Sequence, residues 1–67
     1  MIIYINNNKV EVFSGARVKD AVLAYSRKSY TMMLNEKLLA FDRFGNLTDT
    51  DGPLIEGQKL TLKKNIQ

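Results

Sequence analysis

The chain has 67 residues and a formal net charge of +3, with 45% hydrophobic and 25% charged residues. This composition is typical of one soluble globular domain and unlike that of a disordered chain. The absence of Cys and His excludes disulfides, thiolate metal sites and histidine-based catalysis, and no apolar run is long enough to span a membrane.

The first predicted element is a strand over residues 1–6. Apolar side chains occupy both faces of this segment, which is typical of a central strand with material packed on each side. Three asparagines at residues 6–8 tolerate left-handed backbone and favour a tight reversal. Residues 9–13 then alternate charged and apolar side chains. Together these segments predict a hairpin with one solvated face.

One amphipathic helix is predicted over residues 17–28. Ser14 is a residue type that caps helices, and Gly15 accepts unusual backbone angles just before the helical pattern starts. The apolar stripe at helical spacing consists of Val18, Ala21, Val22 and Tyr25. We expect this stripe to pack against the inner face of a sheet, because no other large apolar surface is available.

Three further extended segments follow the predicted helix. They are a third strand over residues 31–34, a short extended piece over residues 38–41 and a last strand over residues 58–63. In the last strand Leu60 and Leu62 are expected to point inward. Turns rich in Asn, Asp, Gly or Pro separate these segments, at residues 35–37, 42–46 and 51–53.

The order of these elements predicts the architecture. Because the first strand is apolar on both faces, it and the last strand are expected to form the central pair. We therefore predict an α+β fold, with a mixed four- to five-stranded sheet packed on one helix. Residues 1–67 are expected to form a single domain, either as a whole protein or as one domain of a longer one.

Several short motifs along the chain resemble those of a known superfamily. They are Gly15, Val18, Asp20 and Ala21 at the helix start, Met32-Met33-Leu34-Asn35, the pair Leu38-Leu39, and the closing run Leu54-Ile55-Glu56-Gly57-Gln58-Lys59-Leu60-Thr61-Leu62. This pattern resembles the ubiquitin-like β-grasp families, most closely the small bacterial sulfur carriers of thiamin and molybdopterin biosynthesis. The resemblance covers nearly the whole chain and implies a β-grasp fold.

The carrier chemistry is not implied by the residues present. Sulfur carriers act through a flexible C-terminal Gly-Gly whose carboxylate is adenylated and converted to a thiocarboxylate. No glycine follows Gly57, and the sequence ends Lys63-Lys64-Asn65-Ile66-Gln67. A divergent sulfur carrier whose Gly-Gly tail follows residue 67 therefore stays an alternative.

The sequence predicts a non-catalytic ubiquitin-like accessory module that binds a protein partner through its sheet face or exposed edge strand. We expect no catalytic, cofactor-binding or metal-binding residues, because the serines lack a histidine base and residues 47–58 lack two of the carboxylates of a calcium loop. The candidate partner-binding residues are Phe41, Phe44, Tyr4, Lys59 and Lys63. An RNA-contacting role is a further alternative, since lysines beside aromatics suit nucleic acid. Cysteine absence is compatible with a cytoplasmic location.

Overall fold

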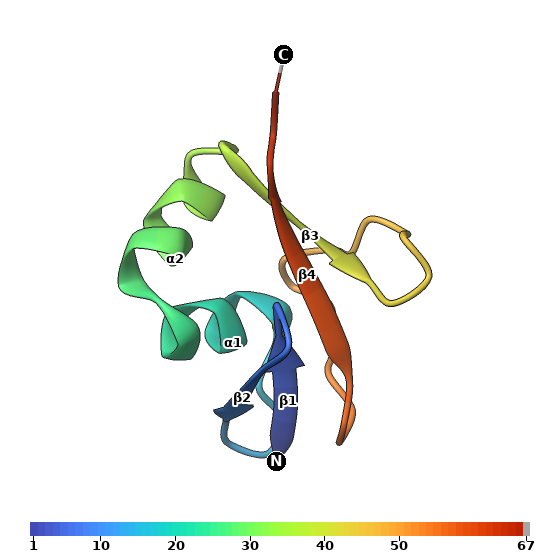
Figure 1. Ribbon diagram of the computed structural model, residues 1–67. Coiled ribbons are helices and arrows are strands. Elements are labelled where there is room, and N and C mark those ends of the chain that lie inside the picture. The colour runs from blue at the N-terminus through green and yellow to red at the C-terminus, as the bar shows by residue number, and fades with distance from the viewer. Residues whose placement is uncertain (67) are drawn as a thin grey trace.

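A mixed four-stranded sheet carries two helices on one of its faces in the computed structural model, which describes residues 1–66 (Figure 1). In chain order the elements are β1 (Ile2–Ile5), β2 (Asn8–Glu11), α1 (Val18–Tyr25), α2 (Arg27–Leu34), β3 (Leu38–Asp42) and β4 (Lys59–Lys64). The strand order is β2-β1-β4-β3, with β1 and β4 parallel and the other neighbours antiparallel. The α+β class and the central pairing of the first and last strands are confirmed.

The predicted hairpin at the start of the chain is confirmed. β1 and β2 pair antiparallel, with Ile5 opposite Asn8 at the end of the ladder. Asn6 and Asn7 form the two-residue connection, with φ of 50° and 69°. Two successive positive φ values are typical of the turns whose twist matches that of the flanking strands, and asparagine tolerates them better than most residues.

The prediction of a single helix over residues 17–28 is wrong, because the chain breaks at Ser26. Ser26 has an extended backbone, with φ of −163°, and it ends α1 while starting α2. Its side-chain oxygen accepts the N–H of Ser29 at 3.2 Å, which caps α2. Neither helix in residues 1–66 combines the length and the apolar sequence that crossing a bilayer requires.

The predicted strand over residues 31–34 is also wrong, since these residues form the second half of α2. The side chain of Met33 points into the core and is 4% exposed, while Tyr30, one helical turn earlier, packs against the same core. The cap at Ser26 and this i, i+3 spacing favour a helix over the strand that the local residue types suggest. The sheet consequently has four strands and packs on two helices instead of one.

The first helix is not capped by Ser14 as predicted. α1 starts after Arg17, whose backbone N–H donates to the carboxylate of Asp20 at 2.9 Å. A carboxylate in the first turn satisfies a free N–H and lies favourably at the positive end of the helix dipole. The cap therefore comes from within the helix.

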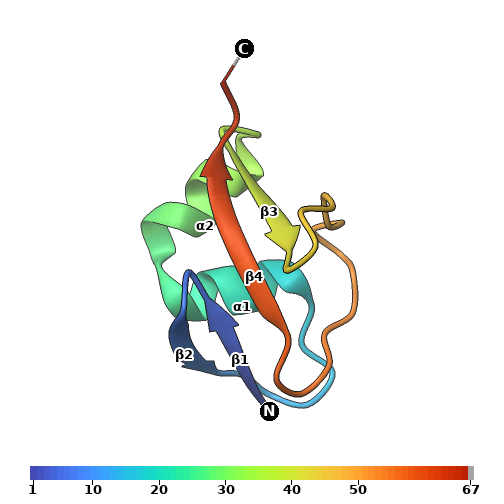
Figure 2. The same ribbon diagram turned by 45° about the vertical axis from the view of Figure 1, so that its right-hand side comes forward.

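Figure 2 shows the helices as a layer beside the sheet, and the hydrophobic core lies between these two layers. It consists of Ile3, Ile5, Val10, Val12, Ala16, Val18, Ala21, Val22, Met33, Leu38, Ala40 and Leu60. Full burial of an aliphatic side chain contributes about 1.5–3 kcal/mol. Ile3, Ile5 and Val22 are completely inaccessible to solvent, so the central strands and α1 share the best packed region.

Within residues 1–66 no helix covers the other face of β1, contrary to the expectation from its apolar sequence. Ile3 and Ile5 point toward the helices, whereas Ile2 and Tyr4 alternate to the opposite face and stay partly exposed. Both helices pack on the inner face. The outer face of the sheet therefore remains accessible over its central strands.

β3 is the edge strand at one side of the sheet, and the segment after it folds back along its outer edge. The N–H of Thr48 donates to the carbonyl of Ala40, and the N–H of Asp42 donates to the carbonyl of Asn46, both at 2.9 Å. The predicted extended piece over residues 38–41 is thus a full strand. Its outer backbone groups are partly satisfied by residues 46–48.

Candidate functional site

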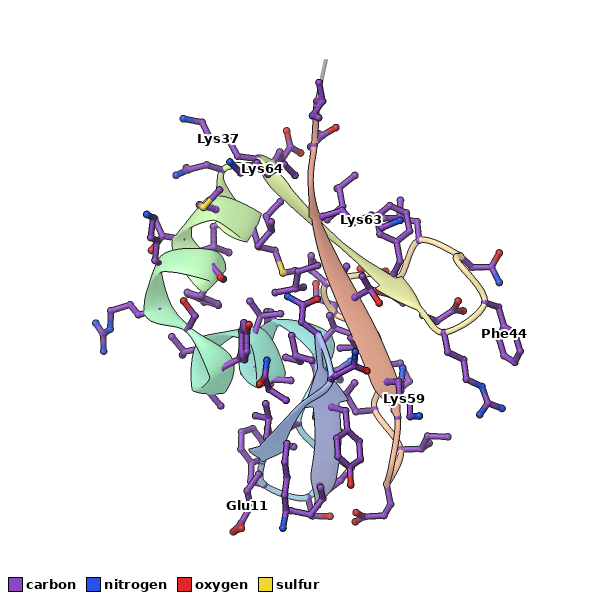
Figure 3. All side chains as sticks on the ribbon, in the orientation of Figure 1. Glu11, Lys37, Phe44, Lys59, Lys63 and Lys64 are labelled. Carbon is purple, nitrogen blue, oxygen red and sulfur yellow. The ribbon has the colours of Figure 1, made fainter. Side chains whose placement is uncertain are left out.

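Aromatic and basic side chains lie together on the outer face of the sheet. We call this surface, formed by Tyr4, Phe41, Lys59, Thr61 and Lys63, the open sheet face. Tyr4 of β1 is in register with Lys59 of β4, and Phe41 of β3 is in register with Thr61. Lys59, Thr61 and Lys63 alternate to the same face of β4, and Figure 3 shows both lysines along this strand.

The two lysines of the open sheet face are exposed, while Tyr4 and Phe41 are half-buried. The ammonium nitrogen of Lys63 lies 5.7 Å from the centre of the Phe41 ring, within range of a cation–π contact. Within residues 1–66 the one salt bridge joins Lys19 to Asp51, so neither Lys59 nor Lys63 is neutralised by a carboxylate. The open sheet face therefore presents positive charge beside aromatic surface.

Phe44 does not share this face with the other four predicted residues. It lies on the turn after β3, is 73% exposed and points away from the sheet (Figure 3). The guanidinium carbon of Arg43 lies 4.8 Å from the centre of its ring. The structure thus brings four of the five predicted residues together and places the fifth on a neighbouring surface.

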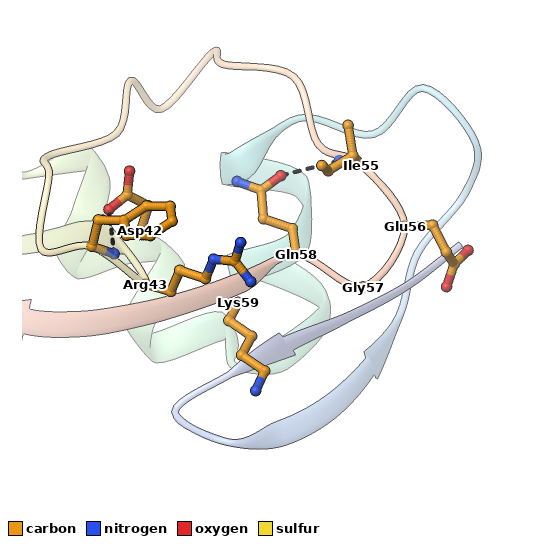
Figure 4. A pocket seen from close by; sticks show the side chains of 8 residues that line it. Asp42, Arg43, Ile55, Glu56, Gly57, Gln58 and Lys59 are labelled. Carbon is orange, nitrogen blue, oxygen red and sulfur yellow. Dashed lines mark hydrogen bonds between the residues drawn. The ribbon is translucent and has the colours of Figure 1, made fainter.

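A cleft of about 370 Å³ lies between the turn that carries Phe44 and the open sheet face, and Lys59 belongs to both the cleft and that face (Figure 4). It is lined by Asp42, Arg43, Phe44, Ile55, Glu56, Gly57, Gln58 and Lys59. Ile55 is 71% exposed, so this cleft offers two large apolar side chains to solvent. Single exposed apolar residues are ordinary, but two that line one cleft are a feature of binding surfaces.

The turn on one side of the cleft is held by the carboxylate of Asp42. Its Oδ1 atom accepts the N–H of Phe44 at 2.8 Å and the N–H of Asn46 at 2.9 Å. These bonds, led by the one from Asn46, favour the ionised form and hold the pKa of Asp42 below its ordinary value. The conformation of the turn that carries Phe44 is therefore fixed by hydrogen bonds to the Asp42 side chain.

The segment on the other side of the cleft is tied to the sheet. The side-chain oxygen of Gln58 accepts the N–H of Ile55 at 3.0 Å, and the Glu56 carboxylate accepts the N–H of Ile2 at 2.9 Å. The N–H of Gly57 donates to the Ile2 carbonyl at 2.7 Å. These bonds fix the loop before β4 against the start of β1.

Across residues 1–66 the structure brings together no group of three or more acidic side chains that could hold a metal ion. The acidic stretch before Gly52 is used in local structure, because Asp49 accepts the N–H of Asp51 at 3.0 Å and Asp51 pairs with Lys19 at 2.7 Å.

Of the eight residues that line the cleft, only Phe44 and Lys59 were predicted from the sequence, and Arg43 and Ile55 are among the six that were not. Arg43 precedes Phe44 in a predicted turn, so an arginine next to an aromatic residue was an available signal. Ile55 had no such signal, because its exposure depends on how the loop before β4 meets the turn after β3. No family model, curated protein or solved structure matches this chain.

Proposed function

We propose that this chain is a non-catalytic interaction module of β-grasp type that binds a protein partner on its open sheet face. The observation that carries this proposal is the clustering of Tyr4, Phe41, Lys59 and Lys63 on one uncovered face. Aromatic side chains supply large contact area on binding, and unpaired lysines favour a partner of opposite charge.

The β-grasp assignment within this proposal is supported by the strand order and by the placement of the helices. A hairpin, a helical segment on one face, and a last strand parallel to the first make up the β2-β1-β4-β3 sheet. The second helix, where the sequence predicts a strand, is a difference from the expected pattern. In a β-grasp fold of this kind, α2 is an elaboration of the helical layer.

The chemistry of the open sheet face describes the partner. Within residues 1–66 neither Lys59 nor Lys63 forms a salt bridge, and the half-buried rings of Tyr4 and Phe41 lie on the same face. The complementary surface is therefore acidic with apolar or aromatic side chains. The cleft next to Lys59 extends this surface toward Phe44 and Ile55. A partner segment that crosses from the sheet into the cleft would cover all five predicted residues.

RNA is the second candidate partner, and one observation favours it. Tyr4 is in register with Lys9 on one side and with Lys59 on the other, so a half-buried ring lies between two exposed cations. A base stacked on Tyr4 would bring its phosphates near both lysines. No comparable observation favours the sulfur-carrier alternative, whose Gly-Gly is missing from residues 58–67.

The test compares two variants with the same change in charge. K59E/K63E reverses the charge of the open sheet face, whereas K37E/K64E reverses two exposed lysines that are not part of this face and lie near the end of β4 (Figure 3). Partners captured from lysate by the wild-type chain are identified, purified and measured for affinity. We expect at least a tenfold loss for K59E/K63E and a smaller change for the control. Equal loss in both variants would contradict the proposed face.

RNA binding is measured on the same variants by the anisotropy of a labelled single-stranded oligonucleotide. Association that weakens steeply with salt and is lost in K59E/K63E would favour the second candidate. Absence of binding at low salt would remove it.

A further inference from the structure

The two edge strands of the sheet, β2 and β3, differ in how far their outer backbone groups are covered. The edge of β3 is partly covered by residues 46–48. β2 is the other edge, and within residues 1–66 it pairs with β1 alone. An uncovered edge strand presents unpaired N–H and carbonyl groups and is a template for pairing with another chain.

The hydrogen bonds around β1 show which groups of β2 point outward. Met1 and Val12 exchange bonds in both directions at 2.9 Å. Antiparallel ladders alternate, so Ile3 bonds Val10 and Ile5 bonds Asn8 in the register of the hairpin.

The hydrogen bonds between β1 and the β4 side are consistent with this alternation of bonded pairs. Ile2, Tyr4 and Asn6 direct their backbone groups to the β4 side, as in the bond from the Tyr4 N–H to the Gln58 carbonyl at 2.9 Å. Lys9 and Glu11, which lie opposite Tyr4 and Ile2, therefore point their N–H and carbonyl groups away from β1. We call this row of free groups the β2 edge.

We propose that the β2 edge pairs antiparallel with the β2 edge of a second copy of this chain, about a two-fold axis at Val10. In that register Lys9 lies directly opposite Glu11 of the second copy, and Glu11 lies opposite its Lys9. Both pairs are of the hydrogen-bonded kind, because their free backbone groups face each other. The two sheets become one continuous sheet.

The charges of the β2 edge identify a second copy as the occupant. Lys9 and Glu11 are both exposed and lie on the same face of β2, separated by one residue. A two-fold axis at Val10 places Lys9 of each copy opposite Glu11 of the other. The result is two cross-strand pairs of opposite charge, and such pairs stabilise neighbouring strands. Like charges at these two positions would instead repel a second copy, which is how edge strands are commonly protected.

This association leaves the open sheet face free, and of the two lysines beside Tyr4 it engages Lys9 but not Lys59. Lys59 and Lys63 lie on β4, beyond β1 from the β2 edge, so the open sheet faces of two copies would lie on the same side of the joined sheet. The inference is therefore independent of the proposed function, and K59E/K63E is expected to associate like the wild type.

Charge reversal tests the pairing with its own control. K9E places Glu opposite Glu in both pairs, and E11K places Lys opposite Lys. The double variant K9E/E11K restores opposite charges in the same register. By sedimentation velocity over about 10 μM to 1 mM, we expect a weak wild-type dimer, a dissociation constant raised at least about tenfold in each single variant, and recovery in the double variant.

Hydrogen exchange supplies a second measurement that identifies the strand. The amides of Lys9 and Glu11 should become protected as the concentration rises, while circular dichroism shows every variant folded. A wild-type chain that stays monomeric at about 1 mM would overturn the proposal. So would single variants that dimerise like the wild type, or a double variant that does not recover.

Discussion

The side-chain oxygen of Asn6 accepts the N–H of Leu62 at 3.0 Å, so a turn residue extends the pairing of β1 with β4 beyond the end of β1. Asn6 also holds a positive φ of 50° in the hairpin turn. One residue therefore serves two structural elements. Asn7, with φ of 69°, shares the second property, and no hydrogen bond of its side chain is found within residues 1–66.

Replacement of Asn6 by glycine should separate these two roles. N6G keeps the positive φ accessible but removes the acceptor for Leu62, so we expect a loss of about 1 kcal/mol in the free energy of unfolding, measured in urea. N7G is the matched control and should be neutral or slightly stabilising, because Asn-Gly is a favoured hairpin turn. Equal losses in N6G and N7G would show that the side-chain bond contributes nothing.

Removal of the Ser26 hydroxyl should destabilise α2. S26A removes the cap on the N–H of Ser29 and is expected to cost about 1 kcal/mol. S29A changes the same residue type one turn later, keeps the N–H that is capped and should change stability by less than about 0.5 kcal/mol. Thermal unfolding of both variants by circular dichroism measures the difference. A larger loss in S29A would contradict the capping role.

Gly57 should resist replacement by residues with a Cβ because of its backbone conformation. Its φ is +81°, and an added Cβ would meet no atom within 4 Å, so any cost arises from the backbone alone. G57A is expected to lose about 1–2 kcal/mol and G57N less, since asparagine tolerates this region better. Urea unfolding of the two variants gives the comparison. If G57A matches the wild type, the loop before β4 adopts another conformation.

Acid should destabilise the chain through two carboxylates. The pKa of Asp42 is lowered by backbone N–H donors, and that of Asp51 is lowered by its bond to Lys19. A folded pKa below the unfolded value gives stability that is present above about pH 4 and is lost as the pH falls through the folded pKa. The urea concentration at the midpoint of unfolding should decrease as the pH is lowered from about 5 to about 2. This decrease should be smaller in D42N and in D51N than in the wild type. An unchanged pH dependence in both variants would contradict these assignments.

The parts of the fold that local chemistry determines were predictable from the sequence. The asparagine turn predicts the first hairpin, because positive φ values are a property of the residues themselves. The alternation in β4 predicts that Leu60 points inward and Lys59 outward, and both are so. The strand predicted over residues 31–34 is wrong. These residues are helical because Ser26 caps α2 and Met33 is buried in the core, and neither feature can be read from the local sequence pattern.

In the candidate surfaces, too, the features set by local sequence were predictable and those set by tertiary contacts were not. Tyr4 and Lys59 were expected on neighbouring strands, and the register places them side by side. The cleft was not predictable, because it forms where the turn after β3 meets the loop before β4. These segments are separated by a loop whose path depends on bonds such as that from the Thr48 hydroxyl to the Ala40 carbonyl.

The central place of β4 has a consequence for how the chain folds. Among the described strands, β3 pairs with β4 alone, so the hairpin of β1 and β2 is connected to β3 through β4. Closing the pair of Tyr4 with Lys59 requires a loop of most of the chain, and long loops slow the formation of their contacts. We therefore expect the hairpin and the helices to form early, and the sheet to be completed late when β4 inserts between β1 and β3.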